Sequence, residues 1–398
     1  ATTAQGTGTI AKRTLTVGAV TAQTKTYDGT TAADASKFRA TLNNVVAGEE
    51  NLVSATAAGA AYNDKNVAGA NAVGYTGVAL AGAGAGNYTI ADTAQGTGTI
   101  TKRTLTLGTV AAQSKTYDGT TAADTSQFRA TLNNVVAGEE NLVGATAAGA
   151  AYNSKDVAGA NAVGYTGVAL TGTGAGNYTV ADTAEGVGTI TKRDLTLGTV
   201  AAQTKTYDGN TAADASQFRA ALGNTVTGDS VSTTATGAAY NDKNVAAANR
   251  VDYTGVALTG ADAGNYSLAA TTAQGAGTIT RRTLTATVTA QQTKTYDGNT
   301  AADASQFHAT LNNVVSGEEN SVTATAAGAA YNSKNVAGAN KVGYTGVALA
   351  GAGAGNYTIA DTAQGTGTIT KRALTLGAVE SQSKTYDGTT AADASKFR

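Results

Sequence analysis

The chain has 398 residues, contains no Cys, Met, Trp or Pro, and carries 14% charged residues with a formal net charge of −1. A near-neutral chain lacks the basic face that nucleic acid requires, and it has no electrostatic reason to bind an anionic membrane. No apolar run approaches the roughly 18 residues of a membrane-spanning helix, and no signal-peptide pattern occurs in this sequence.

Apolar residues alternate with polar ones in short runs, which predicts strands with one buried face. Turn signals separate these runs at Asp28-Gly29, Asn63-Asp64 and Gly82–Gly86. The alternating pairs are, in chain order, Val73 and Tyr75, Val78 and Leu80, Tyr88 and Ile90, and Leu105 and Leu107. The one helix-like stretch, Ala32 to Leu42, is expected to hold a short helical turn.

The main feature is an internal repeat. The string Lys-Thr-Tyr-Asp-Gly recurs with spacings of 90, 90, 89 and 90 residues, at Tyr27, Tyr117, Tyr207, Tyr296 and Tyr386. A period near 90 is too long for a solenoid coil and suits a small domain with its own core. The sequence therefore predicts a tandem array of separate domains.

Six segments follow from this period. Residues 1–11 are expected to be the tail of a preceding repeat, and residues 371–398 the start of a following one, so that the sequence resembles a window of a longer array. The four complete repeats are predicted at 12–101, 102–191, 192–280 and 281–370. The third repeat differs in length at two places, and these predict surface loops near Ala47–Asn51 and Ala91–Gln95.

The connection between repeats is short. Ile100 and Leu105 lie in opposite phases of the alternation, so Ile100 is expected to close one core and Leu105 to open the next, with Lys102-Arg103 exposed between them. We expect an all-β chain of small β-sandwich-like domains, with a β-grasp unit as the alternative, joined into a stiff rod.

Several motifs together resemble a known family. They are the Lys-Thr-Tyr-Asp-Gly string, Gly228-Asp229-Ser230-Val231, the segment from Gly260 to Ser267, and Gly-Thr-Ile-Thr-Lys-Arg-x-Leu-Thr. The chain resembles the YDG repeat domains of large secreted bacterial adhesins similar to filamentous haemagglutinin. The resemblance implies an extracellular or cell-surface stalk, and it brings no catalytic residue. Such repeats often carry Pro between repeats, whereas this chain has none.

Two kinds of candidate site arise from the residues. Asp28, Asp34 and Asp64 offer hard oxygen ligands for calcium, although the spacing of known calcium loops is absent, and no other cofactor is expected. The Asn-x-Ser/Thr pattern that accepts a glycan occurs at Asn87, Asn177, Asn265 and Asn356. The competing interpretation is that each Asn adopts a left-handed turn before a strand.

Other motifs favour structural roles. Tyr27 is expected in the core with its hydroxyl at the edge, and Glu49-Glu50 in a solvated loop. His308 stands where other repeats have Arg and lacks the partners of a catalytic or zinc-binding His. Gly82, Gly84 and Gly86 precede a strand and not the helix of a phosphate-binding loop.

Three functions compete. A stalk that spaces adhesive elements in cell attachment or a biofilm matrix fits near-identical tandem units without site chemistry. Repeats that grip a polysaccharide by avidity are the alternative, as is lateral self-association through edge strands into a matrix filament. An enzyme is not expected. The expected partners are a polysaccharide or a host or bacterial cell surface, with no nucleic acid and no membrane insertion.

Overall fold

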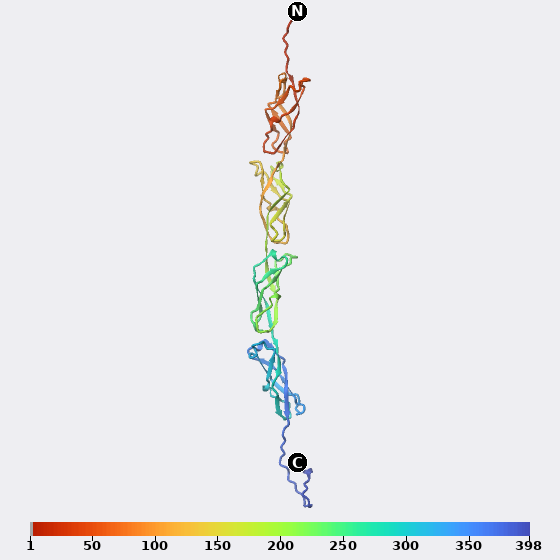
Figure 1. The fold of residues 1–398 in the computed structure, drawn as a ribbon, viewed down its shortest axis with the longest axis vertical. Coiled ribbons are helices and arrows are strands. Elements are labelled where there is room, and N and C mark those ends of the chain that lie inside the picture. Colours follow the sequence, from red (N-terminus) through yellow and green to blue (C-terminus); the bar gives the residue numbers. More distant parts are fainter. Residues whose placement is uncertain (1–2) are drawn as a thin grey trace. The chain divides into compact units, whose positions relative to one another are not determined.

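The computed structural model describes residues 3–398, whose regular structure consists of β-strands and short 3-10 helices without an α-helix. The predicted all-β class is confirmed. The strands of the first repeat gather into one small unit, coloured red to orange in Figure 1, and the other three repeats build the same unit from equivalent strands. None of the helices in residues 3–398 is long and apolar enough to cross a membrane.

The first repeat contains ten strands and two 3-10 helices. They are β1 (Arg13–Thr14), β2 (Thr16–Val20), β3 (Gln23–Thr26), η1 (Ala35–Lys37), β4 (Ala40–Asn43), β5 (Ser54–Thr56), β6 (Gly59–Tyr62), β7 (Ala72–Thr76), β8 (Ala79–Ala81), η2 (Ala85–Asn87), β9 (Tyr88–Thr89) and β10 (Thr93–Thr101).

The same elements follow in the other repeats. The second has β11 (Arg103–Thr104), β12 (Thr106–Val110), β13 (Gln113–Thr116), η3 (Thr125–Gln127), β14 (Ala130–Asn133), β15 (Gly144–Thr146), β16 (Gly149–Tyr152), β17 (Ala162–Thr166), β18 (Ala169–Thr171), η4 (Ala175–Asn177), β19 (Tyr178–Thr179) and β20 (Thr183–Thr191). The third has β21 (Arg193–Val200), β22 (Gln203–Thr206), η5 (Ala215–Gln217), β23 (Ala220–Gly223), β24 (Ser232–Thr234), β25 (Gly237–Tyr240), β26 (Arg250–Thr254), β27 (Ala257–Thr259), η6 (Ala263–Asn265), β28 (Tyr266–Leu268) and β29 (Thr272–Thr280). The fourth has β30 (Arg282–Thr283), β31 (Thr285–Val288), β32 (Gln292–Thr295), η7 (Ala304–Gln306), β33 (Ala309–Asn312), β34 (Thr323–Thr325), β35 (Gly328–Tyr331), β36 (Lys341–Thr345), β37 (Ala348–Ala350), η8 (Ala354–Asn356), β38 (Tyr357–Thr358) and β39 (Thr362–Thr370).

A four-stranded sheet in the order β3-β10-β7-β6 forms the larger layer of the first repeat. The long strand β10 pairs parallel with β3 and antiparallel with β7. The last strand of the repeat is therefore hydrogen-bonded to β3, one of its first strands. Three two-stranded pairs, β1-β9, β2-β4 and β5-β8, make up the rest. Val17, Ala40 and Ala55 of these pairs pack against the buried face of the large sheet, which gives a sandwich-like core.

Aromatic side chains fill that core. Phe38 and Tyr75 pack with their ring centroids 4.6 Å apart, beside the fully buried Val73. The one buried amide there, Gln23, donates to Tyr75 Oη at 2.8 Å and to the carbonyl of Asp34 at 2.8 Å. Because the amide has protein partners, its burial costs little.

The core does not stop at the end of the repeat. Ile100 and Leu105 are both buried, and both belong to one apolar cluster that also includes Val143 and Tyr178 of the second repeat. The expected separation into two independent cores is therefore wrong at this junction. The Arg of the connecting pair, Arg103, is half-buried instead of exposed and donates to the Asn134 carbonyl at 2.7 Å.

Two local predictions need adjustment. The helical turn expected over Ala32 to Leu42 is the single 3-10 turn η1, and the chain is already extended in β4. The loop expected over Ala91–Gln95 is confined to its first residues, because Thr93 begins β10. The loop near Ala47–Asn51 is present, and Gly29 has the positive φ of 78° that the Asp28-Gly29 turn requires.

Gly98→Ala in β10 is expected to destabilise the first repeat by about 1–3 kcal/mol because of overpacking. A Cβ at this position would lie 2.6 Å from Val73 Cγ2 and 2.9 Å from Tyr62 Cε1. Hydrogen exchange of the β7 and β10 amides measures the effect. Gly74→Ala on the neighbouring strand is the control, since its Cβ would meet nothing closer than 3.9 Å. Equal protection loss in both variants would contradict this packing.

Candidate functional site at the junction between repeats

A buried carboxylate joins the first repeat to the second. The Glu139 side chain is 8% exposed, and both of its oxygens accept hydrogen bonds from tyrosine hydroxyls. Tyr27 of the first repeat donates to Oε1 at 2.6 Å, and Tyr178 of the second donates to Oε2 at 2.7 Å. The two rings pack edge to face with centroids 5.3 Å apart. Together these three residues form what we call the carboxylate clamp.

The turn that follows β3 sets the position of Tyr27. Its backbone N–H donates to the Thr101 carbonyl, and the chain then reverses at Asp28-Gly29. The ammonium of Lys25 holds the turn closed by donating to Asp28 at 2.7 Å and to the carbonyl of Thr30 at 2.8 Å. This turn therefore aims the tyrosine at the next repeat.

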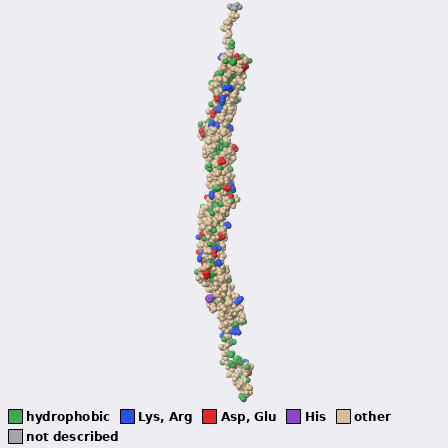
Figure 2. All heavy atoms as spheres, in the orientation of Figure 1, with side chains coloured by type: hydrophobic (Ala, Val, Ile, Leu, Met, Phe, Trp, Pro, Cys, Tyr) green, Lys and Arg blue, Asp and Glu red, His purple; other side chains and the backbone are tan. Residues whose placement is uncertain are grey.

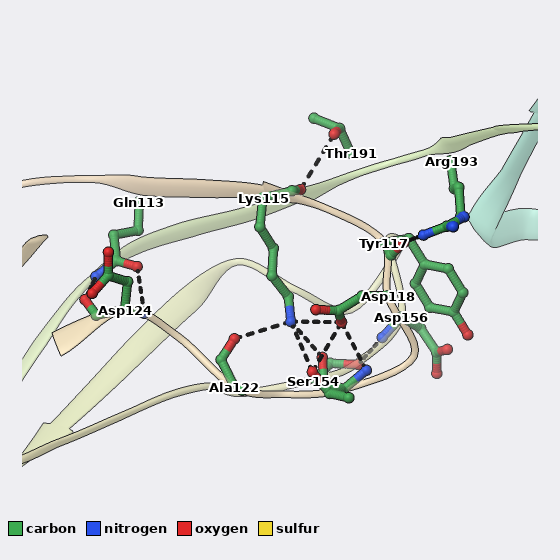
Figure 3. Close-up of polar contacts among 11 residues, drawn as sticks. Gln113, Lys115, Tyr117, Asp118, Ala122, Asp124, Ser154, Asp156, Thr191 and Arg193 are labelled. Atoms are coloured by element: carbon green, nitrogen blue, oxygen red, sulfur yellow. Dashed lines mark hydrogen bonds and ion pairs between the residues drawn. The ribbon is translucent and has the colours of Figure 1, made fainter. Parts of the chain in front are cut away.

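The same turn in the second repeat is drawn in Figure 3. Lys115 Nζ donates to Asp118 Oδ1 at 2.8 Å and to the carbonyls of Thr120 and Ala122 at 2.9 and 3.0 Å. It also lies 5.3 Å from the centroid of the Tyr152 ring. Four favourable contacts around one ammonium make it a structural cation.

The loop from Val136 to Glu140, which we call the acid loop, positions Glu139 within the second repeat. The Val136 N–H donates to Tyr178 Oη at 3.1 Å, and the Glu139 N–H donates to the Val136 carbonyl at 3.0 Å. The next acid, Glu140, instead accepts from the Gly138 N–H at 3.0 Å. Of the two adjacent carboxylates, one thus closes its own loop and the other joins the repeats.

An asparagine makes a second connection, which we call the amide bridge. Asn177 Oδ1 accepts from the Val67 N–H at 2.9 Å, and its Nδ2 donates to Asn66 Oδ1 at 3.0 Å. The side chain is buried, and both of its polar groups are used across the junction.

The carboxylate clamp and the amide bridge recur at the other junctions. Tyr117 and Tyr266 donate to Asp229 Oδ2 at 2.9 and 2.5 Å, and Tyr207 and Tyr357 donate to Glu318 at 2.7 and 2.8 Å. The bridging amides are Asn265, which contacts Val157 and Asp156, and Asn356, which contacts Val245 and Asn244.

The clamp shifts the pKa values of its members in opposite directions. Burial opposes the charge of Glu139, but the hydroxyls of Tyr27 and Tyr178 and the nearby Lys65 ammonium outweigh it and lower the pKa of the carboxyl. Burial and the carboxylate together raise the pKa of Tyr27 far above its ordinary value. At neutral pH the acid is ionised and the phenol is protonated, which is the pairing that the hydrogen bonds need.

The calcium candidates are not brought together. Asp28 binds Lys25, Asp34 caps η1 through the Ser36 N–H, and Asp64 accepts from the Asn66 N–H. Within residues 3–398 no group of three or more His, Asp or Glu side chains could hold a metal ion. Each carboxylate instead stabilises its own turn.

The glycosylation candidates lie at the junctions. Asn177, Asn265 and Asn356 are the bridging amides, and Asn87 occupies the equivalent but exposed position in the first repeat. The alternative of a left-handed turn at these residues is wrong, because positive φ is instead found at Asn44, Asn134, Asn224 and Asn313. Glycosylation stays a prediction, and at the three buried positions a glycan would displace the bridge.

The structure also places the remaining residues that the sequence analysis considered. Tyr27 is buried as predicted, with its hydroxyl in the clamp. The loop of Glu49 is not simply solvated, because the equivalent Glu139 is buried. His308 is exposed, and its backbone carbonyl accepts from Thr289. Gly82 has a positive φ in the turn that leads into η2 and β9.

The profile of the YDG domain matches four segments of the chain, residues 11–96, 101–185, 191–273 and 280–365. The chain belongs to the YDG domain family. The predicted family is confirmed, and the Tyr-Asp-Gly string of this chain lies in the turn that positions the clamp tyrosine. The context of a secreted adhesin stays a proposal.

Two solved structures show what the chain is similar to. The protocadherin gammaB4 extracellular domain is 8% identical, with a TM-score of 0.28, over 89% of this chain and 67% of that one. Drosophila N-cadherin EC1-4 is 10% identical, with a TM-score of 0.22, over 90% of this chain and 100% of that one. Such TM-scores do not establish a shared fold. No curated protein matches the chain.

Tyr27→Phe is expected to weaken the first junction by about 1.5–3 kcal/mol, because it removes a hydrogen bond to a charged group and keeps the ring. Hydrogen exchange at Val136–Glu139 reports the loss. Tyr152→Phe is the matched control, since its buried hydroxyl has no hydrogen-bond partner. If both variants behave alike, the clamp does not hold the junction.

Acid is expected to loosen the first and third junctions. Because folding lowers the pKa of Glu139 and of Glu318, their stabilisation is fully present above the ordinary carboxyl pKa and is lost as pH falls through the lowered value, below about pH 4.5. Exchange protection at the junction, corrected for intrinsic rates, should fall over this range. Glu139→Gln should remove the dependence at the first junction only. An unchanged acid profile in that variant would assign the effect to another group.

Proposed function

We propose that this array of YDG domains is a structural stalk of a secreted or cell-surface bacterial adhesin. Its repeats space adhesive or anchoring elements in cell attachment or in a biofilm matrix. The observation that carries the proposal is the carboxylate clamp. Glu139 and Tyr178 of the second repeat, together with Tyr27 of the first, hold one repeat against the next.

The chemistry of the clamp supports a structural role and not a catalytic one. Both oxygens of Glu139 already accept short hydrogen bonds within the junction, and the residue is only 8% exposed. The Lys115 ammonium likewise donates hydrogen bonds to Asp118 and to the carbonyls of Thr120 and Ala122. The acid of the clamp and the lysine of the turn are thus committed to internal contacts.

The junction also supports a fixed spacing. Tyr27, Glu139 and Asn177 contact each other's repeats through hydrogen bonds and an apolar cluster at the same time. A contact of this kind restricts the angle between the first and second repeats, which a flexible linker would not do. A stalk needs this restriction in order to hold a distal element away from its base.

Binding of polysaccharide by the repeats is the competing function. Exposed aromatic rings are the usual carbohydrate platform, whereas Tyr27, Tyr62, Tyr75 and Tyr88 of the first repeat are all buried. Charged side chains are scattered over the visible surface without a large patch of one sign (Figure 2). Neither feature favours a glycan-binding surface on the repeats.

The test is binding of the intact 398-residue chain to immobilised bacterial exopolysaccharides and host glycans, alongside small-angle X-ray scattering. A stalk predicts Kd values weaker than about 1 mM and an extended particle. Tyr27→Phe combined with Tyr207→Phe should shorten the maximum dimension, while the control Tyr152→Phe should not. Saturable binding tighter than that limit, raised by avidity across the repeats, would make the YDG domains themselves adhesive.

A further inference from the structure

The second repeat is joined to the chain on each side by a single residue. Lys102 lies between β10 and β11, and Lys192 lies between β20 and the first strand of the third repeat. Both residues are exposed. Tension along the chain therefore passes directly into β11 at one end and into β20 at the other, because no loop at either point can lengthen first.

The strand at the entry is paired in parallel. Arg103 and Thr104 of β11 pair with Tyr178 and Thr179 of β19, which precedes the exit strand β20. The Leu105 N–H continues this pairing by donating to the Thr179 carbonyl at 2.8 Å, and the residue is 2% exposed. The first strand of the repeat is thus hydrogen-bonded to one of its last.

A longer parallel pair joins β13 to the exit strand. Residues 113–116 of β13 lie beside residues 188–191 of β20 in four consecutive pairs. The Tyr117 N–H adds a bond to the Thr191 carbonyl at 2.9 Å, and Thr191 Oγ1 donates to the Lys115 carbonyl at 3.2 Å (Figure 3). On its other side β20 pairs antiparallel with β17 in five further pairs, so the exit strand is held along both edges.

The direction of these pairs decides how they respond to tension. The chain reaches β11 and β13 at their N-terminal ends and leaves β20 at its C-terminal end, so tension pulls parallel partners in opposite directions along their own axes. The bonds of a parallel ladder are evenly spaced and run across the strands. Sliding one strand past the other therefore stretches all of these bonds together, whereas pulling apart two neighbouring strand ends breaks them one after another.

We propose that each repeat bears tensile load, with its parallel strand pairs as the elements that resist extension. The equivalents of the β13–β20 pair in the other repeats are β3–β10, β22–β29 and β32–β39, each with four parallel pairs of residues. This further function rests on the proposed stalk, because a stalk between a cell and a surface is under tension whenever the two are pulled apart.

The test pulls the second repeat of the intact chain in two directions. The chain contains no Cys, so two introduced cysteines give unique attachment points for the handles of an optical trap. Lys102→Cys with Lys192→Cys applies tension along the parallel pairs. Thr166→Cys with Thr183→Cys pulls on exposed residues that face each other at one end of the antiparallel β17–β20 pair, and opens it from that end.

Unfolding between positions 102 and 192 is expected to need roughly three times the force, or more, of opening between positions 166 and 183. Four backbone bonds of similar strength share the load in the first direction, and one bond bears it in the second.

Two proline variants identify the ladder as the source of the resistance. The N–H groups of β13, an edge strand, alternate in direction, and the Tyr117 N–H faces β20, so the Lys115 N–H also faces β20 and the Thr116 N–H faces the outer edge. Lys115→Pro should accelerate unfolding at constant force between positions 102 and 192 by about tenfold, because it removes one bond of the ladder. Thr116→Pro is the matched control, since an edge strand tolerates proline where its N–H points to solvent. Lys115→Ala separates the loss of the ammonium from the loss of the backbone bond.

Equal forces in the two directions would overturn the proposal, as would equal acceleration by Lys115→Pro and Thr116→Pro, or an effect of Lys115→Ala as large as that of Lys115→Pro. The comparison of directions needs no proline, so it decides the matter even if Lys115→Pro does not fold. Neither measurement involves a glycan or an adhesive element. The load-bearing proposal can therefore fail while the stalk proposal holds, and binding of glycans by the repeats would leave the measured forces unchanged.

Discussion

The buried carboxylate between two tyrosine hydroxyls is the constraint on which the arrangement of neighbouring repeats depends. An ionised carboxylate removed from water is costly unless hydrogen bonds replace its hydration. Glu139 receives one such bond from its own repeat and one from the repeat before. The acid loop therefore reaches its low-energy state only when the preceding repeat is folded and in place.

This constraint gives four of the five residues of the Lys-Thr-Tyr-Asp-Gly string a physical task. Gly29 supplies the positive φ of the turn, Asp28 and Lys25 close it, and Tyr27 projects from it into the next repeat. The motif is a device for presenting a tyrosine, and the ion pair within it is too exposed on the Asp28 side to contribute much stability by itself. Its value lies in fixing the direction of the phenol.

Sequence reasoning could predict the features that depend on local pattern. Period-two alternation identified strands such as β7, the Asp-Gly pair identified the turn, and the repeat identified the family. It missed the partners of Tyr27 because Glu139 lies 112 residues away in another repeat. One signal was present. The third repeat loses the second acid of the pair but keeps an acid directly after glycine, in Gly228-Asp229.

The asparagine prediction failed for a related reason. A left-handed turn is the common local explanation for Asn before a strand, but Asn177 is buried by a neighbour that no local pattern specifies. Its side chain satisfies a backbone N–H of the first repeat, a demand that arises only once the repeats are docked. Position in a tandem array thus altered the role of a residue whose local sequence suggested either a turn or a glycan.

The second junction shows which part of the site is essential to the geometry. There the acid is Asp229, one methylene shorter than Glu139, and its loop is two residues shorter as well. Both tyrosine hydroxyls still reach one carboxylate, at 2.9 and 2.5 Å. A shorter side chain on a shorter loop therefore still accepts from both phenols, here through the single oxygen Oδ2. The position of the carboxylate between the two phenols is maintained, while the backbone that delivers it is free to vary.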